Sequence, residues 1–135
     1  MDDDERRAAN RARFLTVLET VSAGRFEDLG QSMTDDLVFE LPYGPDFIPN
    51  PIEGLEAWNQ MQLMTFALFS SFRLELMEFH DCLDPDELIA EYRSEATVLR
   101  NGNEYLNRYI GVLRFRDDKI SHWREFHNPQ ATDVL

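Results

Sequence analysis

The sequence predicts an α+β fold, in which a curved antiparallel sheet wraps around N-terminal helices and forms a cone with an internal pocket. Three observations predict it: helical periodicity in the first half, alternating strand-like segments in the second half, and tight turns between those segments. Helices followed by consecutive strands favour helices gathered on one face of the sheet. The 135 residues contain no repeat and no linker, so we expect a single domain over residues 1–135.

Three helical segments are expected before the strands. Apolar residues recur at steps of three and four from Ala8 to Val21, and Gly24 then favours a helix end. A short second helix over 26–33 is expected to break at residues 34–36. A third helix is expected over 54–71, where Trp58 falls on the apolar side and is first interpreted as a core residue.

A proline-rich segment separates a short strand, expected at residues 37–41, from the third helix. Residues 42–51 contain four prolines, which exclude a helix or a central strand. The segment also carries apolar side chains, Tyr43 among them. We therefore expect an ordered loop that folds over another part of the molecule.

Four strands are expected in the second half, at about 73–80, 87–100, 104–115 and 119–127. Asn101-Gly102-Asn103 and Asp117-Asp118 are typical of tight hairpin turns. The four strands therefore form an antiparallel meander.

Charge excludes several classes of partner. Asp and Glu number 26 against 13 Lys and Arg, for a formal net charge of -13. This argues against nucleic acids and anionic membrane surfaces, which attract basic faces. The longest uncharged run, residues 57–72, is too short and too polar for a membrane span.

A single cysteine, Cys82, allows no internal disulfide, and the acidic N-terminus does not resemble a signal peptide. Both observations predict a cytoplasmic protein. Carboxylates beside Cys82 raise the pKa of its thiol, so a small structural side chain is the simpler interpretation. The three histidines lack metal-ligand spacing and no phosphate-binding loop occurs, so we expect neither a metal nor a cofactor.

The last strand carries the strongest candidate for chemistry. Alternation puts Trp123, Glu125 and His127 on one face and Arg124 and Phe126 on the other. If the first row faces the pocket, burial raises the pKa of Glu125 towards neutrality, which suits proton transfer. The alternative is a row that faces solvent or a subunit, with Glu125 paired to an arginine.

The two preceding strands leave alternatives open. Tyr105, Asn107 and Tyr109 share one face, which suits either a pocket wall with orienting hydrogen-bond donors or an ordinary aromatic sheet surface. Arg93 and Glu95 belong to a charged row that suits either a solvated or subunit-facing surface or an acid site braced by arginine.

The segment EYLNRYIGVLRFRDDKISHWREFHNP resembles the closing hairpin of the SnoaL-like and phenazine-biosynthesis A/B families. These belong to the nuclear-transport-factor-2-like superfamily, which includes ketosteroid isomerase and limonene epoxide hydrolase. DLVFELPYGPDFIPNPIEG is similar to the strand, proline-rich loop and helix start of the same families. The resemblance covers about residues 10–130 and implies the cone-shaped fold more strongly than any one reaction.

The resemblance implies roles for individual residues. Glu125 falls where the phenazine A/B proteins keep an acid–base glutamate, and Asn107 and Tyr109 fall on the family's pocket wall. Leu41 and Val17 stand where ketosteroid isomerase has its base and its oxyanion-hole tyrosine. Gly111 stands near that enzyme's protonated aspartate, so steroid isomerisation is not expected. Arg93 and Glu95 only loosely match the epoxide hydrolase pair.

We therefore expect a cofactor-independent acid–base enzyme, of the isomerase, cyclase or condensation type, acting on a small apolar, aromatic or cyclic carbonyl metabolite. Glu125 is the expected proton shuttle. The expected substrate-binding residues are Tyr43, Trp58, Asn107, Tyr109 and His127. The alternatives are a non-catalytic ligand-binding or accessory protein and a pure interaction module. In each case we expect a homodimer that pairs through its sheet face.

Overall fold

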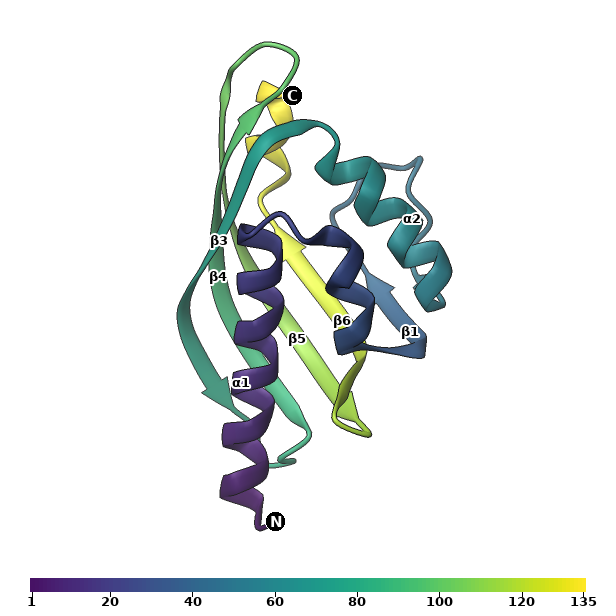
Figure 1. Ribbon diagram of the computed structural model, residues 1–135, viewed down its shortest axis with the longest axis vertical. Helices are drawn as coiled ribbons and strands as arrows, with labels where there is room; N and C mark the ends of the chain where they lie inside the picture. The colour runs from purple at the N-terminus through teal and green to yellow at the C-terminus, as the bar shows by residue number, and fades with distance from the viewer.

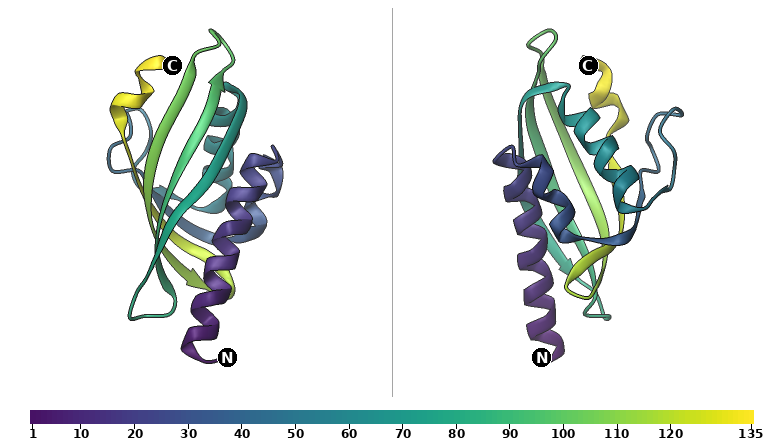
Figure 2. Two further views of the ribbon diagram at one scale, coloured as in Figure 1. Left: turned by 90° about the vertical axis from the view of Figure 1, so that its left-hand side faces the viewer. Right: turned by 45° about the vertical axis from the view of Figure 1, so that its right-hand side comes forward.

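The computed structural model describes residues 1–135 and confirms the predicted α+β architecture (Figure 1). Six strands form one sheet in the order β2-β1-β6-β5-β4-β3. The helices lie on one side of this curved sheet (Figure 2). The elements are α1 (Asp3–Ser22), the 3-10 helix η1 (Phe26–Ser32), β1 (Met33–Glu40), β2 (Ile52–Glu53), α2 (Leu55–Phe66), β3 (Phe69–Asp81), β4 (Glu87–Val98), β5 (Glu104–Arg116), β6 (Lys119–His127) and the 3-10 helix η2 (Pro129–Val134).

Helix α1 has defined signals at both ends. The Asp2 side chain accepts a hydrogen bond from the Glu5 backbone N–H at 2.8 Å, which caps the first turn. Gly24 has φ +74°, so it ends the helix in the left-handed region, as the sequence predicts. No helix of the protein is both long enough and apolar enough to cross a membrane.

Two element boundaries differ from the sequence-based expectation. Helix η1 ends at Ser32, close to the expected position, but Thr34-Asp35-Asp36 already lies inside β1, where the register with β6 shifts between Met33 and Val38. This irregularity leaves the two consecutive aspartates exposed, which regular alternation would not allow. Helix α2 ends at Phe66 rather than near residue 71, because Phe69 already pairs with Val98 in the sheet.

The sheet is an antiparallel meander from β3 to β6, with one parallel pair at its far side. Gly102 has φ +71°, and both Asp117 and Asp118 have positive φ, as tight hairpin turns require. β1 pairs with β6 in parallel, so the expected antiparallel sheet is mixed at this edge. A parallel pair needs a long crossover, which α2 and strands β3 to β5 supply.

The core lies between α1, α2 and the concave face of the sheet. Alternate residues of β4 and β5 are buried, and those between them are mostly exposed or half-buried. From α1, the fully buried Phe14 packs its ring against Tyr92 of β4 and Trp123 of β6, with ring centroids 5.2 and 5.6 Å apart. This side chain joins the helix to two strands that are not neighbours in the sheet.

Replacing Phe14 with Ala removes a fully buried ring that touches two other aromatic rings. We expect the free energy of unfolding in urea to fall by about 3–5 kcal/mol. Leu15→Ala is the matched control, because Leu15 is the next residue on α1 and is 36% exposed. Equal losses for the two variants would contradict the central place of Phe14 in the core.

Candidate active site

The Glu125 side chain lies on the concave side of the sheet. It is half-buried on β6, directly opposite Gly111 of β5, and it shares its face with Trp123 and His127. The alternation predicted for the last strand is confirmed, since Trp123 packs into the core while Phe126 contacts Tyr43 on the other face. The only carboxyl group of this row is thus held among aromatic side chains.

Tyr92 of β4 binds this carboxyl group directly. Its phenol donates a short hydrogen bond to Glu125 Oε2, and the Trp123 indole Nε1–H donates to the phenol oxygen at 3.3 Å. The sequence analysis missed Tyr92. The signal was present, because Tyr92 alternates with the charged row of Arg93 and Glu95, and only one of the two rows can face a core.

Gly111 makes this contact possible. Tyr92 and Glu125 lie on β4 and β6, with β5 between them. A Cβ atom at position 111 would stand 3.1 Å from both the Tyr92 phenol oxygen and the Trp123 Nε1 atom. The absence of a side chain on β5 therefore lets Tyr92 reach across to Glu125.

Burial raises the pKa of Glu125 to about 7, because the ionised carboxylate loses water, while the hydrogen bond from Tyr92 acts in the opposite direction. Burial and the nearby Glu125 carboxylate raise the pKa of Tyr92 well above its usual value, so the phenol stays protonated as a donor. A carboxyl group that is partly protonated near neutral pH can both give and accept a proton.

A second cluster of polar side chains lies further along the concave face. The Tyr109 hydroxyl lies 2.8 Å from Ser94 Oγ and 3.4 Å from the Tyr105 hydroxyl. Asn107 donates to the Tyr105 oxygen at 2.7 Å and to the Asn128 carbonyl at 3.1 Å. The predicted residues Asn107 and Tyr109 thus share the face of Glu125, but the polar atoms of both side chains already form hydrogen bonds within the protein.

Trp58 and His127 each carry a buried nitrogen without a hydrogen-bond partner, namely Trp58 Nε1 and His127 Nδ1. The Trp58 ring lies 6.3 Å from Trp123 and 6.2 Å from Phe39, so α2 brings it over the same face. Burial lowers the pKa of His127 and thereby favours the neutral imidazole.

Tyr43 does not join this group. Its side chain is 59% exposed, and its ring lies 5.9 Å from Phe126, which points away from Glu125. The expected proline-rich loop therefore folds over the edge of the outer face. Tyr43 and Glu125 thus lie on opposite faces, and the substrate-binding role of Tyr43 stays a prediction.

The charged row of β4 faces outward, which decides between the two interpretations of Arg93 and Glu95. Arg93 pairs with Glu75 of β3 at 2.9 Å on this outer surface.

A group of possible metal ligands lies on the same surface. The ligand atoms of Glu78, His80 and Glu91 lie within 4.8 Å of one another and could hold a metal ion. The sequence analysis missed this group because Glu91 joins Glu78 and His80 only through the pairing of β4 with β3. A 2.6 Å contact between His80 Nε2 and Glu91 Oε2 raises the pKa of His80.

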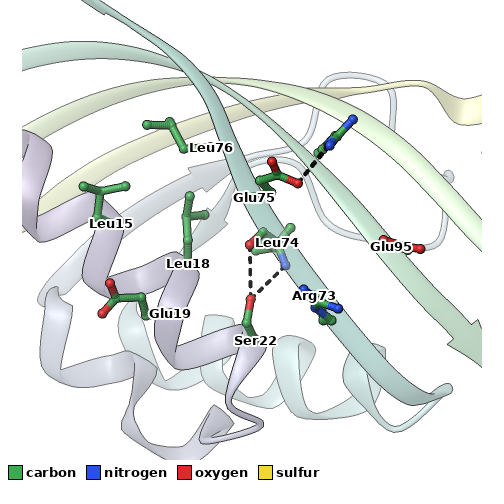
Figure 3. A pocket seen from close by; sticks show the side chains of 10 residues that line it. Leu15, Leu18, Glu19, Ser22, Arg73, Leu74, Glu75, Leu76 and Glu95 are labelled. Atoms are coloured by element: carbon green, nitrogen blue, oxygen red, sulfur yellow. Dashed lines mark hydrogen bonds and ion pairs between the residues drawn. The ribbon is translucent and has the colours of Figure 1, made fainter.

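Two clefts of the molecule lie away from Glu125, and the internal pocket beside this residue stays a prediction. One cleft, of about 380 Å³, lies between α1 and β3 and extends past β3 to Arg93 and Glu95 of β4 (Figure 3). Inside it, Ser22 Oγ accepts a hydrogen bond from the Leu74 N–H at 2.9 Å and lies 3.2 Å from the Leu74 carbonyl oxygen. The other cleft, of about 200 Å³, lies near the C-terminal Leu135.

Cys82 has no features of a nucleophile. The free thiol is half-buried, and burial together with the neighbouring carboxylates raises its pKa. The expectation of a raised thiol pKa is confirmed, with burial as the larger cause. At neutral pH the thiol is therefore protonated.

Comparison with known proteins identifies the family. The SnoaL-like domain matches residues 13–123, so the chain belongs to the SnoaL-like family. An uncharacterised PhzA/B-like protein of Pseudomonas aeruginosa is 34% identical over 93 residues, which span 68% of this chain and 64% of that protein. Both findings confirm the predicted resemblance.

Solved structures confirm the fold. A Bacillus subtilis protein proposed to be an isomerase superposes with a TM-score of 0.84 at 24% identity, covering 99% of this chain and 94% of that one. An NTF2-like protein from Anabaena variabilis gives 0.75 at 20% identity, covering 90% and 87%. At such identities the likeness shows the nuclear-transport-factor-2-like fold and no shared reaction.

The raised pKa of Glu125 predicts a pH-dependent stability difference. Between the unfolded value near 4.5 and the folded value near 7, the native state holds the proton more tightly, so stability falls as the pH rises through this range. Glu125→Gln lacks this loss. Its free energy of unfolding relative to wild type should therefore increase from pH 4 to pH 8, by up to about 3 kcal/mol.

Urea unfolding at a series of pH values measures this difference. Glu95→Gln is the control, because it makes the same chemical change at an exposed position on the outer face. A difference between Glu125→Gln and wild type that stays constant with pH would contradict the raised pKa.

Proposed function

We propose that the protein is a cofactor-independent acid–base enzyme of the isomerase, cyclase or condensation type, with Glu125 as the proton shuttle. Its substrate is a small, uncharged, apolar or cyclic carbonyl metabolite bound on the concave face. The observation that carries this proposal is the Glu125 carboxyl group, held among aromatic rings with a pKa of about 7. The isomerase proposed among its structural relatives agrees with this class of reaction.

The surroundings of Glu125 support an uncharged substrate. The inward-facing rows of β4, β5 and β6 carry no arginine or lysine that could neutralise a carboxylate or phosphate. Trp58 Nε1 and His127 Nδ1 offer unused hydrogen-bonding groups beside the aromatic surface. A ligand oxygen near either group would gain a partner that the protein alone does not provide.

Hydrogen–deuterium exchange tests the proton shuttle without knowledge of the natural substrate. Wild-type protein is incubated in D2O with a panel of cyclic and aryl-fused ketones, and loss of the α-hydrogen signals is followed by proton NMR. We expect catalysed exchange of at least one ketone, and Glu125→Gln should slow it by about 10²–10⁴-fold. Glu95→Gln should leave it unchanged.

The outcome also separates the two main functions. Ketones that bind, as judged by quenching of tryptophan fluorescence, but never exchange faster than in buffer would favour a non-catalytic ligand-binding or accessory protein. Exchange that survives Glu125→Gln would remove Glu125 as the shuttle.

A homodimer formed through the outer face of the sheet completes the proposal. Leu106 and Ile110 of β5 are exposed there at 54% and 43%. The outer rows of β3 and β4 are rich in glutamate, whereas that of β5 carries Arg108, Arg114 and Arg116. Two copies related by a twofold axis could therefore pair opposite charges around an apolar centre.

We also propose that the protein works in the cytoplasm, because its single cysteine allows no internal disulfide.

Light scattering at micromolar concentration tests the dimer. We expect the mass of two chains for wild type and of one chain for Ile110→Arg, because a buried unpaired charge opposes association. Leu83→Arg, at a position 97% exposed in the turn between β3 and β4, is the control and should remain dimeric. A wild-type mass of one chain would contradict the proposal.

A further inference from the structure

We propose that Tyr92 is the positioning residue of the site: it binds Oε2 of Glu125 and leaves Oε1 as the oxygen that exchanges a proton with the ligand. This inference deepens the proposed function and rests on Glu125 being the proton shuttle. Its support is a chain of contacts that fixes both the place and the direction of the Tyr92 hydroxyl.

The Tyr92 ring cannot easily turn away. It is fully buried, it stacks on Tyr109 with centroids 5.1 Å apart and planes at 14°, and Phe14 packs against it at 60°. A ring confined in this way holds its hydroxyl in one place. The hydroxyl then fixes the carboxyl group that it binds.

The direction of the hydrogen bonds follows from their chemistry. An indole N–H can only donate, so the Tyr92 oxygen accepts from Trp123 Nε1. The phenol hydrogen is then free to point at Glu125 Oε2. The chain therefore runs from Trp123 through Tyr92 to Glu125, and each donor strengthens the next.

The two oxygens of Glu125 consequently differ. Oε2 accepts the Tyr92 hydrogen bond, whereas Oε1 makes no hydrogen bond to the protein and is not fully enclosed. Oε1 is thus the oxygen that a ligand can approach. Gly111 is part of this arrangement, because any side chain on β5 at that point would crowd the phenol oxygen.

NMR titration of the Glu125 side-chain carboxyl carbon tests the inference, with Tyr92→Phe as the variant. Loss of a donor to the carboxylate should raise the pKa of Glu125 by about one pH unit or more. Tyr109→Phe is the matched control, since it removes a hydroxyl from the neighbouring stacked ring that does not bind Glu125. It should move the pKa of Glu125 much less.

Gly111→Ala is the second variant for this titration, and it serves as the test if Tyr92→Phe does not fold. The new methyl group should displace the phenol by a few tenths of an ångström and shift the pKa of Glu125 in the same direction. An unchanged pKa in a folded Tyr92→Phe protein would overturn the inference and leave Tyr92 as a packing residue.

The titration needs no substrate, so it separates this inference from the proposed function. Failure of ketone exchange in wild type, together with a shifted pKa in Tyr92→Phe, would overturn the catalytic role assigned to Oε1 but not the contact itself. Where exchange does occur, its pH midpoint in Tyr92→Phe should move to higher pH with the pKa of Glu125.

Discussion

The contact of Phe14 with Tyr92 and Trp123 is the interaction on which the site depends. It joins α1 to two strands that do not pair with each other, and it packs the helix against the two side chains that surround the Glu125 carboxyl group. Aromatic rings in such edge-to-face arrangements restrict one another strongly. The polar atoms at the rims of these rings are therefore placed as firmly as the rings themselves.

A carboxyl group in this setting is costly to the fold. Ionised Glu125 gives up much of its hydration and receives a single hydrogen bond in return, which is why burial outweighs the phenol in setting its pKa. A glutamine or a leucine at this position would avoid that cost. The presence of an acid among these apolar rings is therefore better explained by chemistry than by stability.

Much of the architecture could be predicted from the sequence, because alternation in β5 and β6 and the turns at Gly102 and Asp117 follow from local rules. The same alternation put Glu125 with Trp123, and a family resemblance supported its inward direction. Local rules failed at Asp35 and Asp36, where an irregular pairing with a distant strand overrides the pattern. They also assigned too many residues to α2.

The site itself was less predictable, since it depends on contacts between strands. Nothing in the local sequence links Tyr92 to Glu125, because the link needs the β4–β5–β6 register and the missing side chain at Gly111. Tyr43 shows the converse problem. A proline-rich loop can be recognised from its composition, but composition does not reveal which surface the loop covers.

The Ser22 hydroxyl has a consequence for how molecules of this kind can associate. Strand β3 is at the border of the sheet, where free amide and carbonyl groups invite another chain to add a strand. Ser22 occupies both groups of Leu74 in the middle of that border, and α1 stands beside it (Figure 3). An added strand would have to displace Ser22 from Leu74, so this contact opposes edge-to-edge association through the middle of β3, while the outer face of the sheet remains accessible.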